Sequence, residues 1–450
     1  MICLFSYLER GLFCGLIGVA AIALPVVADI GGVTPNPSVV ITENLLSLVP
    51  SNANQSVPEP IQKWRDTVYN DRYLSPWRRQ KPFFDQGLDW FVRIFQKSTY
   101  YGENKQPIDP TYLQSIAQNM DCSHYQRLTQ KAITVTNTSL RVIPTTRPFF
   151  LSFDLPGEGY PFDYAQESGI PANTPIMITH YTLDGAWILV ETAELAGWLP
   201  VQDVASIYET QTALFEKQPY VAVIRDQVPV KDIDEQFLWK ARIGMVLPVS
   251  RETSGSYQVW VAKRGTDGKA IFTTARLSAK VVQPKPIPLT AASIAEIGNQ
   301  LMNQPYGWGD LVENRDCSSM LADLFAPFGL WLPRNGNDQG RFGGYAISLA
   351  HLSPKDKEIT LIKNGIPFFT LLWLKGHIML YVGTASGRAL VFHNLWGLRT
   401  LKSDGSLGRY VIGKAVVTTL QPGNSLPNAD PDGDLLKRLD MMTILMPRFY

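Results

Sequence analysis

The sequence predicts an α+β protein in which an N-terminal helical segment and two small β-barrels precede a C-terminal domain of mixed helices and strands. Apolar residues first follow a helical period, then form short runs separated by turns, and finally form a helix that longer strands follow. With 450 residues, the chain is long enough for several such domains.

Charge and composition exclude one broad class of function. The chain has 41 Lys and Arg against 40 Asp and Glu, a net charge of +1, and so lacks the basic excess of a nucleic-acid-binding protein. Hydrophobic residues make up 45% of it, which is enough for sizeable cores. We expect no nucleic-acid partner, no metal site, no cofactor and a monomeric chain.

The N-terminus predicts export. Arg10 precedes an apolar run that ends in small residues at Val26 and Ala28. This pattern is typical of a secretory signal cleaved before Asp29, so 1–28 is expected to be a signal peptide and the mature protein to lie in the periplasm or cell envelope. The alternative is an uncleaved anchor, because the run approaches the length that spans a bilayer.

A disulfide framework is not expected. Once the signal peptide is removed only Cys122 and Cys317 remain, and they are far apart in the sequence. A single bridge between them is the alternative for an exported protein.

The first part of the mature chain is expected to be a linker followed by helices. Residues 29–58 are rich in Pro, Asn and Ser, which is typical of a linker. Over 59–132 we expect a helical domain, because apolar residues recur there at helical spacing. They are Leu88, Phe91, Val92 and Phe95. Asp109 supplies an N-cap and Pro110 the first residue of a further helix.

Two sets of short strands follow. The first set, over 133–210, includes the apolar runs 175–179 and 187–190, and the second, over 211–283, includes 220–224. Short strands at this spacing predict two SH3-like barrels in tandem. One larger β-sandwich is the alternative.

The C-terminal domain is expected over 288–420, after a proline-rich linker, and 421–450 is expected to be a tail. Thr290 caps its first predicted helix.

Cys317 is predicted to be a nucleophile at the start of a helix. The residues at i+3, i+4, i+7 and i+8 from it are apolar and share its helix face. Asp316 stands at the N-cap position, so Cys317 lies in the first turn, where N–H groups and the helix dipole favour a thiolate and can hold an oxyanion. The alternative is a small buried residue, the commonest role of an unbridged Cys.

Two downstream histidines match this nucleophile. His377 begins one predicted strand and His393 lies near the end of the next. A thiol needs a base, and the base needs a partner on its other ring nitrogen to fix the tautomer. Adjacent strands would bring the two rings together, so Cys317, His377 and His393 are the predicted catalytic residues.

Four motifs follow one another in this part of the chain. They are Tyr-x-Trp-Gly from Tyr306, Asp-Cys-Ser around Cys317, Gly-His-Ile-Met-Leu-Tyr-Val-Gly around His377 and His-Asn-x-Trp-Gly from His393. Their order resembles the NlpC/P60 cysteine peptidases of bacterial cell walls, and the likeness covers about 290–420. Tandem barrels ahead of such a domain resemble the multidomain branch of γ-D-glutamyl-L-diamino acid endopeptidases.

The resemblance implies a papain-like α+β catalytic domain and a substrate class, the stem peptides of peptidoglycan. Cys317 would attack the carbonyl of the D-Glu γ-linkage to a diamino acid. His377 would accept the thiol proton and later protonate the leaving amine, while His393 would orient His377. The Cys317 N–H and the Tyr306 hydroxyl are implied oxyanion donors.

The resemblance also implies how the other end of the substrate is bound. Asp316 and Ser318 would line the site that takes the free amine of an N-terminal L-Ala. The first barrel matches the family in 162–164 and 197–198, and Asp163 from it is a further candidate for this site. The simpler explanation for Asp163 is that it is a turn residue without a role in binding.

Asp310 and Ser319 stand where many members of the family have Gly, and Asp310 is expected at the rim of the cleft. Cys122 lies in a second Asp-Cys-Ser tripeptide. No apolar helix face follows this tripeptide, so we expect Cys122 to be structural.

Two rival functions use the same features. In one, the barrels bind peptidoglycan and the last domain is a weakly active or inactive adaptor. In the other, the thiol serves an amidase or acyltransferase on the same scaffold.

Overall fold

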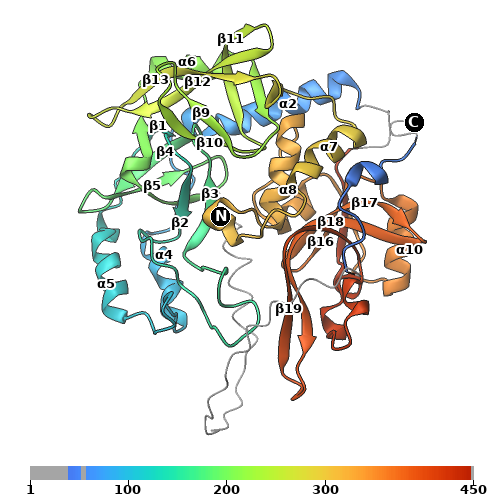
Figure 1. Ribbon diagram of the computed structural model, residues 1–450. Coiled ribbons are helices and arrows are strands. Elements are labelled where there is room, and N and C mark those ends of the chain that lie inside the picture. The colour runs from blue at the N-terminus through green and yellow to red at the C-terminus, as the bar shows by residue number, and fades with distance from the viewer. Residues whose placement is uncertain (1–38, 52–56, 447–450) are drawn as a thin grey trace.

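The computed structural model describes residues 39–51 and 57–446, and Figure 1 shows how their helices and strands are arranged. The predicted signal peptide over 1–28 lies outside the described residues. None of the helices in the described ranges has the length and apolar composition that a bilayer crossing requires. The choice between signal peptide and anchor therefore stays a prediction.

The N-terminal helices are α2 (Glu59–Tyr73), α3 (Ser75–Arg78), α4 (Asp89–Arg93) and α5 (Pro110–Asn119). The predicted cap is confirmed, since the Asp109 side chain accepts from the Thr111 N–H and Pro110 begins α5. The apolar residues of α4 and α5 pack in one buried cluster with Trp198 of the first barrel. The N-terminal segment therefore shares a core with that barrel.

The first barrel is a seven-stranded antiparallel sheet with the order β3-β2-β6-β5-β4-β1-β7. Its strands are β1 (Gln130–Thr134), β2 (Thr138–Arg141), β3 (Gln166–Ile170), β4 (Pro175–Tyr181), β5 (Trp187–Glu191), β6 (Ala196–Pro200) and β7 (Val204–Ser206). Its own buried residues, Ile176 and Ile188 among them, form a separate core. A long connection between β2 and β3 leaves the barrel on the side of the C-terminal domain.

The second barrel follows the short helix α6 (Ala213–Glu216) and has its own core around Trp239. Its strands are β8 (Tyr220–Val223), β9 (Val228–Lys231), β10 (Phe237–Ala241), β11 (Val246–Thr253), β12 (Ser256–Arg264), β13 (Ala270–Ser278) and β14 (Val282–Pro284). Since the two strand sets form separate sheets with separate cores, tandem barrels are confirmed and the single β-sandwich is wrong.

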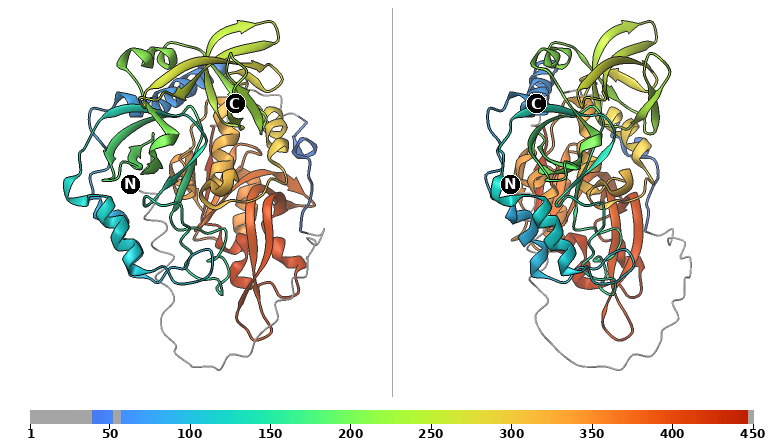
Figure 2. Two further views of the ribbon diagram at one scale, coloured as in Figure 1. Left: turned by 60° about the vertical axis from the view of Figure 1, so that its left-hand side comes forward. Right: turned by 90° about the vertical axis from the view of Figure 1, so that its left-hand side faces the viewer.

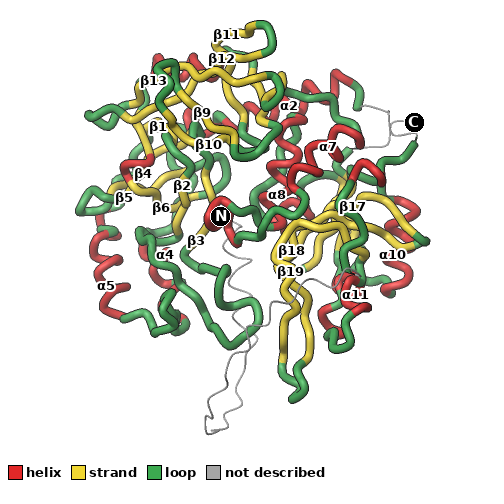
Figure 3. Tube along the Cα trace, in the orientation of Figure 1, coloured by secondary structure: helices red, strands yellow, loops and turns green. Residues whose placement is uncertain are grey.

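The C-terminal domain places helices against a six-stranded sheet of order β15-β20-β16-β17-β18-β19. Its helices are α7 (Ala291–Leu301), α8 (Cys317–Phe325), α9 (Gly336–Phe342), α10 (Pro354–Asn364) and α11 (Leu435–Arg438). Its strands are β15 (Tyr345–Ser348), β16 (Thr370–Leu374), β17 (His377–Ala385), β18 (Arg388–Leu401), β19 (Leu407–Thr419) and β20 (Met441–Ile444). The β18–β19 hairpin extends beyond the rest of the sheet (Figure 3).

The segment expected to be a tail, 421–450, is part of this sheet. β20 pairs with β15 on one side and β16 on the other, so its last strand completes the sheet between them. A run of four apolar and polar residues is too short to be recognised as a strand without its neighbours.

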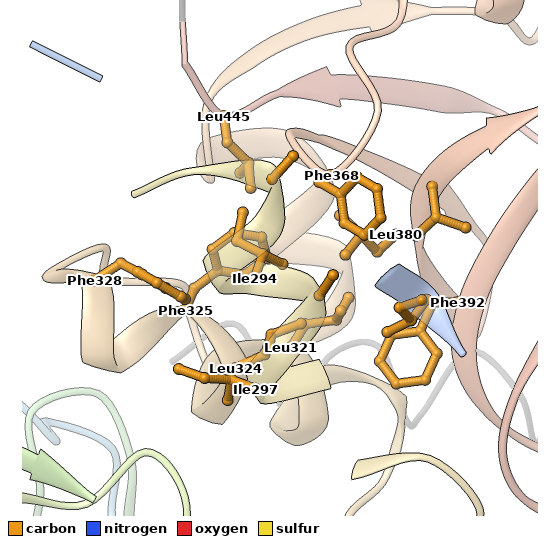
Figure 4. Close-up of a cluster of buried hydrophobic side chains, with 14 of the residues drawn as sticks. Ile294, Ile297, Leu321, Leu324, Phe325, Phe328, Phe368, Leu380, Phe392 and Leu445 are labelled. Carbon is orange, nitrogen blue, oxygen red and sulfur yellow. The ribbon is translucent and has the colours of Figure 1, made fainter. Parts of the chain in front are cut away.

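The core of the C-terminal domain lies between α7, α8 and the sheet (Figure 4). The predicted α8 face is confirmed, because Met320, Leu321, Leu324 and Phe325 are all buried there. Ile294 and Ile297 of α7 and Phe392 of β18 pack in the same cluster. This packing fixes where the start of α8 lies relative to the strands that carry the histidines.

Part of the predicted linker belongs to this core. The Ile41 N–H donates to Val417 O at 3.0 Å, which pairs the segment with β19. Leu45 is fully buried, and its side chain lies where a Cβ on Gly298 of α7 would be. The described part of 29–58 is therefore a strap across the domain rather than a free linker.

Leu45→Ala should lower the free energy of unfolding of the C-terminal domain by about 2–5 kcal/mol, because it leaves a cavity beside Gly298. Leu46→Ala is the matched control, since Leu46 is 43% exposed. Chemical denaturation of both variants checks this. Equal stability of the two would show that the strap does not contribute to the core.

Candidate active site

The start of α8 is held by a capping box. The Asp316 side chain accepts from the Ser318 and Ser319 N–H groups, and the Asp316 N–H donates to Ser319 Oγ at 2.9 Å. The predicted N-cap is thus confirmed, and Cys317 is the first residue of the helix. Neither Cys317 nor Cys122 takes part in a disulfide, so the alternative bridge is absent from the described residues.

The two predicted histidines are in direct contact. His377 Nε2 lies 2.8 Å from His393 Nδ1, and His393 Nε2 lies 3.0 Å from Thr418 Oγ1 on the next strand. His377 begins β17 as expected, whereas His393 lies in the middle of β18 rather than near its end. The strand is longer than its apolar run because it continues into the β18–β19 hairpin.

The hydrogen bonds around His393 fix its tautomer. The Thr418 hydroxyl donates its only proton to Thr419 O at 2.7 Å, so it can only accept from His393 Nε2–H. Burial, together with the neighbouring His377, lowers the pKa of His393 well below its usual value, and this ring is neutral. His393 Nδ1 is therefore an acceptor for His377 Nε2–H. His377 is left with Nδ1 as its basic nitrogen.

Asn394 ties the nucleophile helix to the histidine strand. Its side-chain amide donates to Arg315 O at 2.7 Å, two residues before Cys317 and next to His393. α8 also packs on β17 and β18. The start of α8 is thus fixed against the two strands that carry His377 and His393.

The carboxylate of Asp316 is already paired with Arg334. The guanidinium makes two contacts with it, at 2.8 Å from Nη2 to Oδ2 and 3.3 Å from Nη1 to Oδ1. The Ser318 hydroxyl also donates to Oδ1, at 2.9 Å. Although burial opposes its ionisation, Arg334 and the cap hydrogen bonds together lower the pKa of Asp316. Asp316 therefore caps α8 and binds Arg334. Asp316 and Ser318, the two residues expected at the amine site, thus both belong to this group of hydrogen bonds at the start of α8.

The two residues that depart from the family pattern contact each other. Ser319 Oγ donates to Asp310 Oδ1 at 2.6 Å. Asp310 is only 5% exposed, so its expected place at the cleft rim is wrong, and it lies beneath α8. Burial, only partly offset by Arg242 and Arg334, raises the pKa of Asp310. A hydroxyl proton directed at this carboxylate satisfies it in the low-dielectric interior.

The second barrel reaches the same region through charged pairs. Arg315 makes a bidentate pair with Asp226 of that barrel, at 2.7 and 2.9 Å. Arg242 of the barrel contacts Asp323 of α8 at 2.7 Å, and Arg315 Nε contacts the same carboxylate at 2.7 Å. In both views of Figure 2 the second barrel lies above the first barrel and the C-terminal domain. The second barrel thus contacts α8 at Asp323 and also holds Arg315, the residue before the N-cap.

The first barrel contacts the other flank of the helix start. Ser168 Oγ accepts from Arg334 Nε at 2.7 Å, and Gln166 donates to Gly309 O at 2.8 Å. Glu194 accepts from the Arg334 N–H at 2.7 Å and from the Trp331 indole. The first barrel and Asp316 therefore lie on either side of Arg334 and both contact it.

No hydrogen bond or ion pair among the described residues joins Asp163 to the start of α8. Its carboxylate lies inside the first barrel, accepts from the Phe149 and Ala165 N–H groups, and pairs with Arg141 at 2.7 Å. It organises the long β2–β3 connection, as expected for a turn residue. The neighbouring Phe162 instead extends to the C-terminal domain.

Phe162 joins an aromatic group beside the histidines. Its ring centroid lies 5.0 Å from that of Trp308, 5.8 Å from Trp396 and 6.2 Å from the predicted oxyanion donor Tyr306. His377 and these four aromatic residues line one cavity. Tyr306 and the predicted base thus line the same cavity.

Sequence reasoning missed two residues that shape this site, Arg334 and Thr418. Arg334 stands at the end of the motif-bearing region but is remote from Asp316 in sequence, and a Thr in a strand has no distinguishing pattern.

Within the described residues no group of three or more His, Cys, Asp or Glu side chains is arranged to hold a metal ion.

Four family models match successive parts of the chain. They are the N-terminal NLPC_P60 stabilising domain over 44–125, an SH3 domain of SH3b1 type over 148–200, an SH3 domain of SH3b2 type over 209–254 and the NlpC/P60 family over 303–400. No curated protein matches the chain.

A solved structure agrees with these models over most of the chain. An NlpC/P60 endopeptidase from Photobacterium damselae subsp. piscicida is 25% identical with a TM-score of 0.80, over 90% of this chain and 97% of that one. An NlpC/P60 family protein from Bacillus cereus is 15% identical with a TM-score of 0.46, over 70% and 100%. The chain is a multidomain member of the NlpC/P60 family, with a stabilising domain and two SH3 domains ahead of its NlpC/P60 domain.

Proposed function

We propose that this protein hydrolyses the bond between γ-D-Glu and a diamino acid in peptidoglycan stem peptides that begin with a free L-Ala. The observation that carries the proposal is the hydrogen-bonded His377–His393–Thr418 chain beside a helix that begins at Cys317. Membership of a family of cell-wall peptidases supports the substrate class. We further propose that the protein works outside the cytoplasm, in the periplasm or cell envelope.

The proposed reaction proceeds through an acyl-enzyme. His377 Nδ1 takes the thiol proton, and Cys317 Sγ attacks the γ-carbonyl carbon of D-Glu. The oxyanion is stabilised by the Cys317 N–H and the Tyr306 hydroxyl. His377 then passes its proton to the nitrogen of the diamino acid, which leaves, and activates a water that releases the D-Glu product from sulfur. His393 stays neutral and holds the His377 ring in place.

The first barrel supports the proposed preference for a short N-terminal side. Ser168 and Glu194 bind Arg334, and Arg334 binds Asp316 at the start of α8. A peptide that passes Asp316 toward this flank meets the barrel. The expected limit is therefore one of length, with the charge of the amine a smaller factor, because the Asp316 carboxylate already has a cationic partner.

Cys317→Ala should abolish turnover without changing the melting temperature, because it removes the attacking atom and little volume. Iodoacetamide should modify Cys317 much faster than Cys122, since burial raises the pKa of the Cys122 thiol whereas helix N–H groups favour a thiolate at Cys317. Mass spectrometry of labelled peptides measures both rates. Equal labelling, or turnover by Cys317→Ala, contradicts the assignment, and a wild type without turnover favours the adaptor.

Thr418→Val should lower kcat/KM about tenfold or more, because it leaves His393 Nε2–H without its acceptor and frees the ring to change tautomer. The acidic limb of the pH–rate profile should move to lower pH, since His377 loses a well-placed acceptor. Thr418→Ser, which keeps the hydroxyl, is the control. An unchanged profile in Thr418→Val would show that the threonine only packs.

L-Ala-γ-D-Glu-diaminopimelate should be cut, while its N-acetylated form and a form extended by one N-terminal Gly should lose about tenfold or more in kcat/KM. The extended peptide keeps an ammonium, so it tests length alone. A peptide with propionyl in place of Ala keeps the length without the charge and should lose less. Equal cleavage of all four, followed by mass spectrometry of the products, would show an open groove and a general wall hydrolase. A cut between sugar and peptide would favour the amidase.

A further inference from the structure

We propose that the substrate groove continues on the leaving side of the scissile bond, from the cavity beside His377 into a second cavity that binds one further amino acid joined by an amide to the diamino acid. The proposal rests on the proposed function. The cavity beside His377, the first cavity, has a volume of about 300 Å³. The second cavity, lined mainly by segment 421–437 and by β18, has a volume of about 410 Å³. Ligand sites usually have volumes of about 300–1,000 Å³.

The two cavities border each other. Leu398 and Arg399 of β18 line both of them, and so do Gly433 and Leu435 of segment 421–437. This segment packs along β18, and its helix α11 lies beside the β18–β19 hairpin (Figure 3). Since both cavities are partly open to solvent, a chain can pass from one to the other over the shared residues. A ligand that fills the first cavity therefore has the second within reach.

The border between the cavities is held by close contacts. A Cβ on Gly433 would lie only 2.6 Å from Cβ of Arg399, so glycine at this position lets the two segments approach. Arg399 pairs with Asp430 at 2.6 Å, and the Asp430 N–H donates to Arg399 O at 3.0 Å. These contacts fix segment 421–437 against β18. Both cavities therefore have their walls in place without a substrate, as is usual for binding sites.

The position of His377 tells which part of the substrate enters the first cavity. The base that took the thiol proton must deliver it to the departing amine nitrogen, so the leaving residue lies on the His377 side of the scissile bond. His377 itself lines the first cavity. On the opposite flank, Ser168 and Glu194 of the first barrel contact Arg334. The diamino acid therefore occupies the first cavity, and a residue joined to it extends toward the second.

Apolar side chains form most of the second cavity. Prolines and aliphatic residues from three parts of the chain line it. They include Pro354, Leu398, Pro422, Leu426, Ala429 and Pro431. Asn424 adds a side-chain amide that makes no hydrogen bond with any other described residue. An amide offers both a donor and an acceptor, which are the groups that a peptide bond can pair with. The cavity therefore matches a small apolar residue held through an amide linkage.

The charges around the second cavity are balanced. Two basic residues, Arg399 and Lys437, and two acidic residues, Asp430 and Asp434, line it among the described residues. Arg399 pairs with Asp430, and Asp434 accepts from the Lys437 N–H at 2.9 Å. A lining of balanced charge gives no preference for an ion of either sign. The occupant that fits is an uncharged residue such as alanine.

Three peptides test whether an added residue helps. They are L-Ala-γ-D-Glu-diaminopimelate, the same tripeptide with D-alaninamide on a diaminopimelate carboxylate, and the tripeptide with N-acetyl-D-alanyl on the free amine of diaminopimelate. Wild type should cleave at least one extended peptide about fivefold or more better in kcat/KM, because the added residue contributes binding free energy. The extended peptide that gains identifies whether the carboxyl or the amine branch enters the second cavity.

Two variants that fill the second cavity should remove this gain. Ala429→Phe and Asn424→Trp each place a ring in it, so the ratio of kcat/KM between extended and unextended peptides should fall to about one. Asn424 is exposed, so its replacement disturbs little packing. Ala385→Phe is the matched control, because Ala385 is exposed at the far end of β17 and lines neither cavity. Melting curves confirm that each variant is folded. A gain that survives in both filling variants overturns the proposal.

A binding measurement separates this proposal from the proposed function. Titration calorimetry of the wild type should show that diaminopimelate carrying the added residue binds more tightly than diaminopimelate alone, and Ala429→Phe should remove the difference. Cleavage of the tripeptide with no gain from extension, in cleavage or in binding, overturns the second cavity and leaves the proposed function standing. Tighter binding of the extended fragment that Ala429→Phe removes, with no cleavage of any peptide, overturns the proposed function and leaves the second cavity standing.

Discussion

The structure depends on holding the first turn of α8 inside a buried, charged junction. Asp316 caps the helix, Arg334 neutralises the cap, and Arg315 ties the preceding residue to Asp226 of the second barrel. Burying a charge costs free energy unless it is paired and hydrogen-bonded, so each of these ions requires the others. Because the partners come from both barrels, the first helical turn is positioned by three domains rather than by its own domain alone.

The cost of burying a charge also determines the state of His393, which stays neutral. His393 is fully buried, and no carboxylate contacts either of its ring nitrogens in the described residues, so it is held neutral. A neutral partner fixes the direction of His377 through one hydrogen bond and does not strongly stabilise the imidazolium form. Charge is thus concentrated beneath the helix and kept out of the hydrogen-bond chain. This division lets the base return its proton readily.

Much of the fold could be predicted from local pattern, and the remainder depends on contacts between distant segments. Asp109, Thr290 and Asp316 stand at helix starts that their chemistry alone marks, and the structure has a side-chain cap at each. β20 and the strap at Leu45 escaped because short segments gain their structure only from the sheet and helix they meet. The role of Arg334 escaped for a similar reason, since this residue pairs with Asp316 and contacts the first barrel across a domain boundary. Features set by residues that are close in the sequence could be predicted, whereas contacts between segments that meet only after folding could not.

The contact between Ser319 and Asp310 has a consequence for how substitutions at these two positions combine. Asp310 keeps a left-handed backbone, with φ of 61°, that a glycine adopts without strain. Glycine at Ser319 alone would leave the Asp310 carboxylate buried without its hydroxyl donor, whereas glycine at Asp310 alone would leave the hydroxyl without its acceptor. The effect of each substitution on stability thus depends on the state of the other. The two sites are therefore epistatic, and the cost of replacing both by glycine is smaller than the sum of the two single costs.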